Sequence, residues 1–280
     1  MPGPTNASAS AAAQNGVNSN TINSILNASN GNGTTNPVPH RAFDSIEDTI
    51  AAFARDEFVV VLDSPSRENE GDLIIAASAL TPAKMAFMIR YTSGYICAPL
   101  SVNRAAALHL PQMVENSTDP NRTAYTVSVD AIGPEMSTGI SASDRAQTCR
   151  MLADPAMSHT HFRRPGHILP LQARDGGVRV RRGHTEAAVE LCRLAGKQQV
   201  GAICELISDG EVVAGRPEMV GGGMMRTEEC LAFGKKWGLK VCTIEDLVEY
   251  IEKTEGSSGT LRALWREQLQ ACTIRDLDRR

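Results

Sequence analysis

The chain has 280 residues, of which 42% are hydrophobic, and a formal net charge of −4 at pH 7. This size and apolar content suffice for a large buried core, so we expect a globular protein. The slightly acidic balance, without a basic stripe, argues against nucleic acid or an anionic membrane surface as a partner. No apolar run approaches the roughly 20 residues that span a bilayer, and the first residues lack the features of a secretory signal. We therefore expect a cytoplasmic protein.

Both ends of the chain differ in composition from its middle. Residues 1–40 contain no Asp, Glu, Lys or Arg and are rich in Asn, Ser, Ala and Gly. Such a segment cannot bury enough apolar area to offset the entropy of ordering it, so we predict a disordered N-terminal tail. Residues 255–280 open with a Gly/Ser linker and form a C-terminal tail. One domain is expected between them, over residues 41–254.

Hydrophobic spacing and capping residues predict the elements of this domain. In chain order, we expect a helix that starts at the capping box 45–48, strands at 58–62 and 73–77, a helix from Thr81 to Arg90, strands at 95–100 and 124–129, a helix within 139–155, strands at 168–172 and 178–180, a helix at 185–194, a strand at 200–207, and helices at 227–237 and 244–252. Helices and strands are interspersed without a strict period, which favours one mixed domain.

The seven cysteines never form a C-x-x-C pair and lie in apolar stretches. They are interpreted as free, buried thiols in a reducing compartment, which disfavours a structural zinc site.

The loop between the first two predicted strands carries Asp63, Arg67, Glu68, Glu70 and Asp72. Carboxylates this close together repel one another, and a bound divalent cation would relieve the repulsion. Oxygen ligands suit Mg²⁺ or Mn²⁺, which keep several waters and take one or two carboxylates. An ordinary solvated hairpin loop is the alternative that these residues alone leave open.

A second segment, RRGHTEAAVELCRLAG at 181–196, places two arginines and a glycine before a helix that we expect Thr185 to cap. Free N–H groups at a helix start attract anions, and Arg181 and Arg182 would add charge-assisted hydrogen bonds. The segment therefore predicts a phosphate site. His184 is either a metal ligand or a surface or capping residue.

Two single residues also stand out. His167 follows a Pro-Gly turn and precedes a strand, so its side chain would project from a fixed backbone. Glu205 interrupts an apolar strand, where a carboxylate is costly to bury unless it is paired or used. An outward-facing position is the alternative for Glu205.

These segments occur together and in order. The stretches RENEGD, FMIRYTSGYICAPL, STGISASDRAQTCRMLADP, RRPGHILPL, RRGHTEAAVELCRLAG and ICELI resemble the 3,4-dihydroxy-2-butanone 4-phosphate synthase family of riboflavin biosynthesis, over about residues 41–253. The resemblance implies an α+β fold with a single mixed β-sheet covered by helices, and a homodimer. It implies a lyase that uses Mg²⁺ (or Mn²⁺) and no redox cofactor. The implied reaction converts D-ribulose 5-phosphate into L-3,4-dihydroxy-2-butanone 4-phosphate and formate, through an enediol, a rearrangement and loss of C4.

The resemblance also implies roles for particular residues. Glu68 and His184 would ligate the metal, Glu70 would serve a second ion, and His167 and Glu205 would be the acid/base groups. The substrate contacts would be Arg67, Glu68, Asp72, Arg181, Arg182, Gly183, His184, Thr185 and Glu205. Cys97, Thr138 and Asp144 are expected near the site without an assigned role.

Two departures and two alternatives remain. The family often has a second acid where this chain has Ser64, and the region 216–229 is longer than in bacterial relatives. A metal-dependent sugar-phosphate isomerase or aldolase would stop at the enediol, and a phosphosugar-binding protein would not turn over at all. Release of formate separates the synthase from both.

Overall fold

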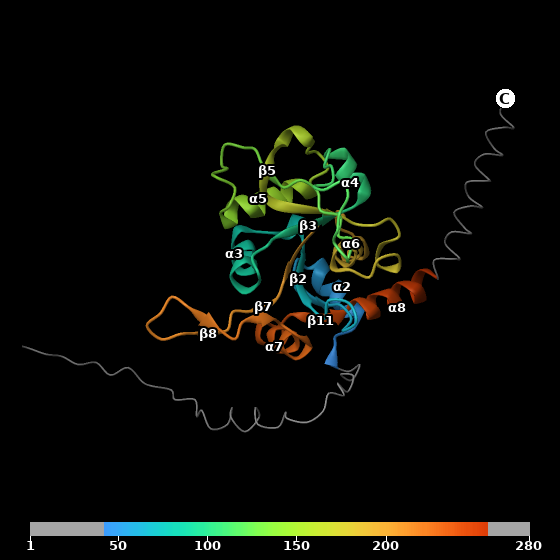
Figure 1. Ribbon diagram of the computed structural model, residues 1–280. Helices are drawn as coiled ribbons and strands as arrows, with labels where there is room; N and C mark the ends of the chain where they lie inside the picture. The colour runs from blue at the N-terminus through green and yellow to red at the C-terminus, as the bar shows by residue number, and fades with distance from the viewer. Residues whose placement is uncertain (1–41, 257–280) are drawn as a thin grey trace, which may run out of the picture. The chain divides into compact units, whose positions relative to one another are not determined.

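A seven-stranded sheet between two layers of helices forms the part of the chain that the computed structural model describes, residues 42–256 (Figure 1). The strands of this sheet are β1 (Val59–Leu62), β2 (Gly71–Ala76), β3 (Cys97–Leu100), β4 (Val129–Ala131), β5 (Phe162–Gln172), β6 (Gly201–Glu205) and β11 (Lys240–Thr243). The helices are α2 (Ile46–Ala54), α3 (Pro82–Tyr91), α4 (Val102–Ala107), α5 (Ala142–Ala153), α6 (His184–Leu194), α7 (Thr227–Trp237) and α8 (Ile244–Glu255).

The sheet is mixed, and its order is β11-β1-β2-β6-β3-β5-β4. The pairs β1–β11 and β3–β5 are parallel, and the other neighbouring strands are antiparallel. Two small two-stranded ladders lie outside it, formed by β7 (Ile207–Ser208) with β10 (Gly223–Met224) and by β8 (Glu211–Val212) with β9 (Met219–Val220). The prediction of an α+β fold with one mixed sheet covered by helices is confirmed.

The central strands are buried on both faces, because alternate side chains enter two separate cores. Val60 and Leu62 of β1 pack with α3, α5 and α7, whereas Val59 and Val61 pack with α2, α6 and α8. Figure 1 shows α3 and α5 on one side of the sheet and α6 and α8 on the other. The sheet is therefore a rigid frame for side chains at its strand ends.

Local capping explains where several helices begin. Ser45, Thr81, Ser101, Ser141 and Thr243 each accept a hydrogen bond from a backbone N–H in the first turn of the helix that follows. The predicted starts of the helices at Thr81, at the capping box 45–48 and at residue 244 are confirmed.

Four predicted strands differ from the structure. The strand predicted at 168–172 begins already at Phe162, so Pro165 and Gly166 lie within β5 and do not form a turn before His167. Residues 178–180 do not form a strand, because Gly176 and Gly177 have φ of 91° and 60° and lead into a 3₁₀ turn, η4 (Gly177–Arg179). Residues 124–129 hold isolated bridges at Tyr125 and Thr126, and the strand starts only at Val129. Residues 200–207 are divided between β6 and β7. The other 3₁₀ turns are η2 (Ala77–Ala79) and η3 (His159–His161).

The remaining predictions concern the state of the cysteines, the two tails and the presence of a membrane-spanning helix. Cys97, Cys149, Cys192, Cys204, Cys230 and Cys242 are free and buried, as predicted. Cys272 and both predicted tails, apart from residues 255 and 256, lie outside the described residues. Within residues 42–256, no helix has the length and apolar character needed to cross a bilayer.

Candidate active site

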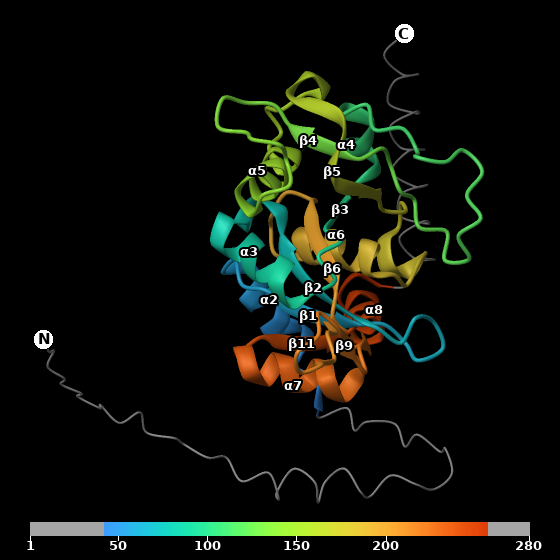
Figure 2. The same ribbon diagram turned by 60° about the vertical axis from the view of Figure 1, so that its left-hand side comes forward.

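The acidic loop between β1 and β2 is shaped by Asp63, which is 5% exposed at the end of β1. Its two carboxylate oxygens accept hydrogen bonds of 2.9 Å from the backbone N–H groups of Glu68 and Glu70. The Arg67 guanidinium adds a 2.9 Å ion pair to the same carboxylate. These contacts fix the backbone, so the loop is not an ordinary solvated turn. It projects on the same side of the sheet as the 112–125 segment (Figure 2).

Sheet register places two carboxylates side by side. Asp72 on β2 lies directly opposite Glu205 on β6, and side chains at such positions start about 5 Å apart. The Asp72 side chain is buried, and its Oδ1 atom has no hydrogen-bond partner among the described residues. Burial raises the pKa of Asp72 to about 7, against the effect of the nearby His184. A buried acid of this kind holds or releases a proton near neutral pH.

His184 is the first residue of α6 and faces these carboxylates. Its Nε2 atom lies 3.1 Å from the Val61 carbonyl oxygen, so Nε2 carries the proton that is donated to it. Its Nδ1 atom is 3.7 Å from Glu68 Oε2 and 3.8 Å from Asp72 Oδ1. Burial would lower the pKa of His184, but Asp72 and Glu68 outweigh burial and raise it to about 9. The position between Nδ1 and the carboxylates therefore favours a cation.

These atoms fit a divalent metal ion. Glu68 offers an oxygen, His184 offers its Nδ1 nitrogen once a cation displaces the proton there, and the unpaired Asp72 oxygen lies beside them. Within residues 42–256, no group of three or more His, Cys, Asp or Glu side chains is arranged to hold a metal by itself. Mg²⁺ suits such a site, since it takes one or two carboxylates and completes its shell with water and substrate oxygens.

Glu205 is held by Ser93, a residue that the sequence did not single out. The Ser93 hydroxyl donates to Glu205 Oε2 at 2.7 Å and accepts from the Tyr95 backbone N–H at 3.2 Å. The Ser93 backbone N–H also donates to the Glu205 carbonyl oxygen at 2.9 Å. One carboxylate oxygen of Glu205 is thus fixed, and the residue is not a free surface acid.

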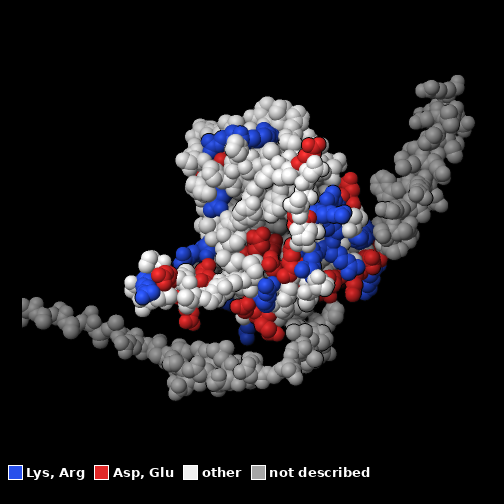
Figure 3. Space-filling model, in the orientation of Figure 1, with Lys and Arg blue, Asp and Glu red and all other residues white. Residues whose placement is uncertain are grey.

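A cavity of about 70 Å³ joins these groups and includes most of the predicted site residues. It is lined by Arg67, Glu68, Glu70, Asp72, Cys97, Thr123, Tyr125, Leu171, Arg181, His184, Thr185, Ile203 and Glu205. Thr123, Tyr125, Leu171 and Ile203 were not anticipated. On the face seen in Figure 3, acidic side chains gather near the centre with Lys and Arg side chains beside them.

The 181–185 segment differs in part from its prediction. Thr185 does not cap α6, because the helix starts at His184 and Gly183 is the N-cap. Arg181 is paired with Glu186 at 2.6 Å, and a Cβ atom on Gly183 would lie 2.3 Å from Arg181 Nη1. A larger residue at position 183 would therefore require the Arg181 guanidinium to shift. Thr185 and Arg181 line the cavity, whereas Gly183 and the exposed Arg182 are not among its lining residues.

His167 lies apart from this cavity. Its Nδ1 atom is 2.8 Å from Asp130 Oδ2, and its backbone N–H donates to Asp130 Oδ1 at 2.8 Å. It precedes the cavity residue Leu171 by four positions on β5, or about 13 Å along the strand. Thr138 and Asp144 lie with this second group, since the Thr138 carbonyl accepts from Arg163, which also binds Asp130, and Asp144 binds the adjacent backbone.

Known proteins resemble this chain over most of the described domain. The family model of 3,4-dihydroxy-2-butanone 4-phosphate synthase matches residues 47–250. A 3,4-dihydroxy-2-butanone 4-phosphate synthase of Pyricularia oryzae is 60% identical over 227 residues, which are 81% of this chain and 97% of that protein. The enzyme of the same name from Schizosaccharomyces pombe is 51% identical over 74% of this chain and 97% of its own length.

A solved structure gives the same result in three dimensions. The crystal structure of a 3,4-dihydroxy-2-butanone 4-phosphate synthase in complex with two magnesium ions superposes with a TM-score of 0.76 and 62% sequence identity. The match covers 76% of this chain and 99% of that one. The overall fold of this chain is therefore that of a solved 3,4-dihydroxy-2-butanone 4-phosphate synthase.

Proposed function

Since the chain belongs to the 3,4-dihydroxy-2-butanone 4-phosphate synthase family, we propose that it converts D-ribulose 5-phosphate into L-3,4-dihydroxy-2-butanone 4-phosphate and formate in riboflavin biosynthesis. The observation that carries the proposal is the group of Glu68, Asp72 and His184 beside Glu205. This group favours a bound cation and places proton-transfer side chains in one cavity. Enediol formation requires a base for the carbon-bound proton, and a cation can stabilise the oxyanion that develops.

Different side chains are proposed for metal binding, proton transfer and substrate binding during enediol formation. Removing a carbon-bound proton beside the ketone moves negative charge onto the ketone oxygen. Mg²⁺ or Mn²⁺, held by Glu68 and His184, would supply Lewis-acid stabilisation of that charge. Glu205, with one oxygen fixed by Ser93, is oriented to take or return the proton. Asp72 lies opposite Glu205 and binds the substrate hydroxyls. The magnesium complex of the related crystal structure supports a divalent cation, and no step here requires a redox cofactor.

The substrate phosphate is proposed to lie at the start of α6. Thr185 lines the cavity there, and the first N–H groups of the helix favour an anion. Arg67 also lines the cavity, but it is paired with Asp63 and Glu68, and the exposed Arg182 is the remaining cationic side chain of the 181–185 segment. Arg181 shares its charge with Glu186, so its contribution is to hold the wall of the cavity rather than to neutralise the phosphate alone.

We further propose a homodimer in which His167 of one copy acts at the cavity of the other. Within one chain His167 does not line the cavity, yet its imidazole is 40% exposed and is oriented by Asp130. Ile132 and Ile140, which are 53% and 52% exposed, add apolar surface in the neighbouring loop. An interface through this face would bring a second acid/base group to each site.

The reaction and the dimer are tested separately. Purified protein is incubated with D-ribulose 5-phosphate and Mg²⁺, and formate is followed by proton NMR. An enediol without formate would indicate an isomerase or aldolase instead. For the dimer, chains carrying His167→Ala and Glu68→Ala are each expected to be inactive, and mixing them should restore activity, since each mixed dimer then holds one intact site. No recovery in mixed dimers shown to form would contradict the shared site.

A further inference from the structure

A loop far from the acidic loop in sequence reaches the proposed metal ligand. The Asn121 side-chain amide donates to Glu68 Oε1 at 2.7 Å. The other oxygen, Glu68 Oε2, faces His184 Nδ1 and the Arg67 guanidinium. Each carboxylate oxygen therefore has its own partners, and Asn121 fixes the plane of the group from the side away from His184.

The 119–123 segment that carries Asn121 is held in place from both sides. The Asp119 carboxylate accepts hydrogen bonds from the backbone N–H groups of Asn121 at 3.2 Å and Thr123 at 2.6 Å. Arg181 donates to the Asn121 carbonyl oxygen at 3.0 Å and to the Thr123 hydroxyl at 2.9 Å. The same guanidinium is paired with Glu186 of α6. The position of Asn121 is thus tied to the first turn of the helix that carries His184.

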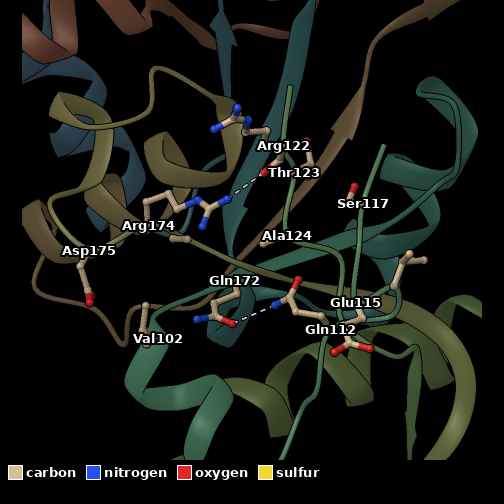
Figure 4. A pocket seen from close by; sticks show the side chains of 12 residues that line it. Val102, Gln112, Glu115, Ser117, Arg122, Thr123, Ala124, Gln172, Arg174 and Asp175 are labelled. Atoms are coloured by element: carbon tan, nitrogen blue, oxygen red, sulfur yellow. Dashed lines mark hydrogen bonds between the residues drawn. The ribbon is translucent and has the colours of Figure 1, made fainter. Parts of the chain in front are cut away.

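This segment contributes to two cavities. Thr123 lines the 70 Å³ cavity and also a second one of about 730 Å³, which Figure 4 shows. Arg122 adopts a left-handed φ of 52°, and Arg174 donates to its carbonyl oxygen at 3.2 Å, as the dashed line in Figure 4 shows. A left-handed conformation costs a non-glycine residue about 1 kcal/mol or more. The hydrogen bonds to the 119–123 segment offset this cost at Arg122.

We propose that Asn121 is a positioning residue that holds Glu68 for the divalent cation. The proposal rests on the proposed function, in which Glu68 is a metal ligand. A neutral amide suits this task, because it orients the carboxylate without cancelling the charge that attracts the ion. Partners that orient a ligand in this way change metal affinity by about 10- to 100-fold when they are removed.

The test measures Mg²⁺ affinity by calorimetry on the full chain without substrate, and then kcat and KM with substrate. Asn121→Ala is expected to raise the Kd for Mg²⁺ about tenfold, with kcat recovering to within about twofold at saturating Mg²⁺. Asp119→Asn keeps the amide of residue 121 but weakens its loop, so a smaller rise in the Kd is expected. Asn103→Ala, at an exposed position of α4, is the matched control and should bind Mg²⁺ like the unaltered chain.

Wild-type Mg²⁺ affinity in Asn121→Ala would overturn the inference. So would an unchanged Kd combined with a lower kcat or a higher KM at saturating Mg²⁺, since that result places Asn121 on the substrate instead of Glu68. If Asn121→Ala unfolds, Asp119→Asn decides by the same criteria. If the unaltered chain binds no Mg²⁺, the metal role of Glu68 fails and the inference fails with it. If the unaltered chain binds Mg²⁺ and Asn121→Ala binds it equally well, only the inference fails.

Discussion

Replacing Glu205 by glutamine tests the proposed chemistry most directly. Gln has nearly the same size as Glu, and its carbonyl oxygen can still accept the 2.7 Å hydrogen bond from Ser93. The change removes only the group that can take or return a proton beside Asp72. We therefore expect substrate binding to persist and the chemical step to slow.

The expected size follows from the contacts of this residue. Loss of general acid/base catalysis lowers rates by about 10²- to 10⁴-fold, which corresponds to about 3 to 5.5 kcal/mol in the activation free energy. The free energy of unfolding should change by no more than about 1 kcal/mol, because the hydrogen bond to Ser93 is retained. Glu205→Gln should thus lose rate and keep its stability, whereas a variant at a purely structural residue should lose stability and keep its rate.

Formate release gives kcat, calorimetry gives the Kd for ribulose 5-phosphate, and urea unfolding gives stability. Glu190→Gln is the matched control, because Glu190 is a carboxylate held by a partner, Arg193 at 2.7 Å, but lies outside the cavity. It should lose stability and keep its rate. Near-normal turnover in Glu205→Gln would refute the acid/base role and reduce Glu205 to a structural residue.

Three further predictions concern removal of the metal, removal of residues 1–40, and the charge of Asp144. EDTA should abolish formate release and Mg²⁺ should restore it, whereas activity of Glu68→Ala in chelator would contradict the metal assignment. A chain that starts at Arg41 should keep its melting temperature and its turnover, and loss of either would show that residues 1–40 pack on the domain. The hydrogen bond from Ser137 lowers the pKa of Asp144 to about 2 from 3.8, so its stabilisation is present above pH 3.8 and lost as pH falls through 2. Asp144→Asn should therefore cost about 2 kcal/mol at pH 7 and lose less stability on acidification in urea titrations, and an unchanged acid dependence would disprove this.

Local rules predicted most helices because the caps lie beside the residues they cap, as Thr81 and Thr243 show. They missed β11, since four residues with Lys240 at the start give no clear alternation. They also predicted a strand at 178–180, where the left-handed glycines impose a turn. Short segments of this kind depend on what the rest of the fold places beside them.

The site was predictable to the extent that its residues are unusual in type. Glu68, Asp72, His184 and Glu205 line one cavity, whereas His167, which the resemblance grouped with Glu205, does not line it. Ser93 and Asn121 were not identified, because a serine or asparagine in a polar loop has nothing in its sequence context to mark it. Their roles arise from contacts across 112 and 53 residues of sequence, and only the folded chain reveals such contacts.

The parallel pairing of β11 with β1 has a consequence for synthesis in the cell. It joins Val60 to Val241, near opposite ends of the domain. At about 5 to 20 residues per second, roughly 10 to 40 s separate the translation of these two strands. Throughout that interval the outer edge of β1 lacks its partner, and an unpaired edge is a template for aggregation. Until β11 emerges, the edge strand β1 of the nascent chain is therefore open to pairing with the strand edges of other chains.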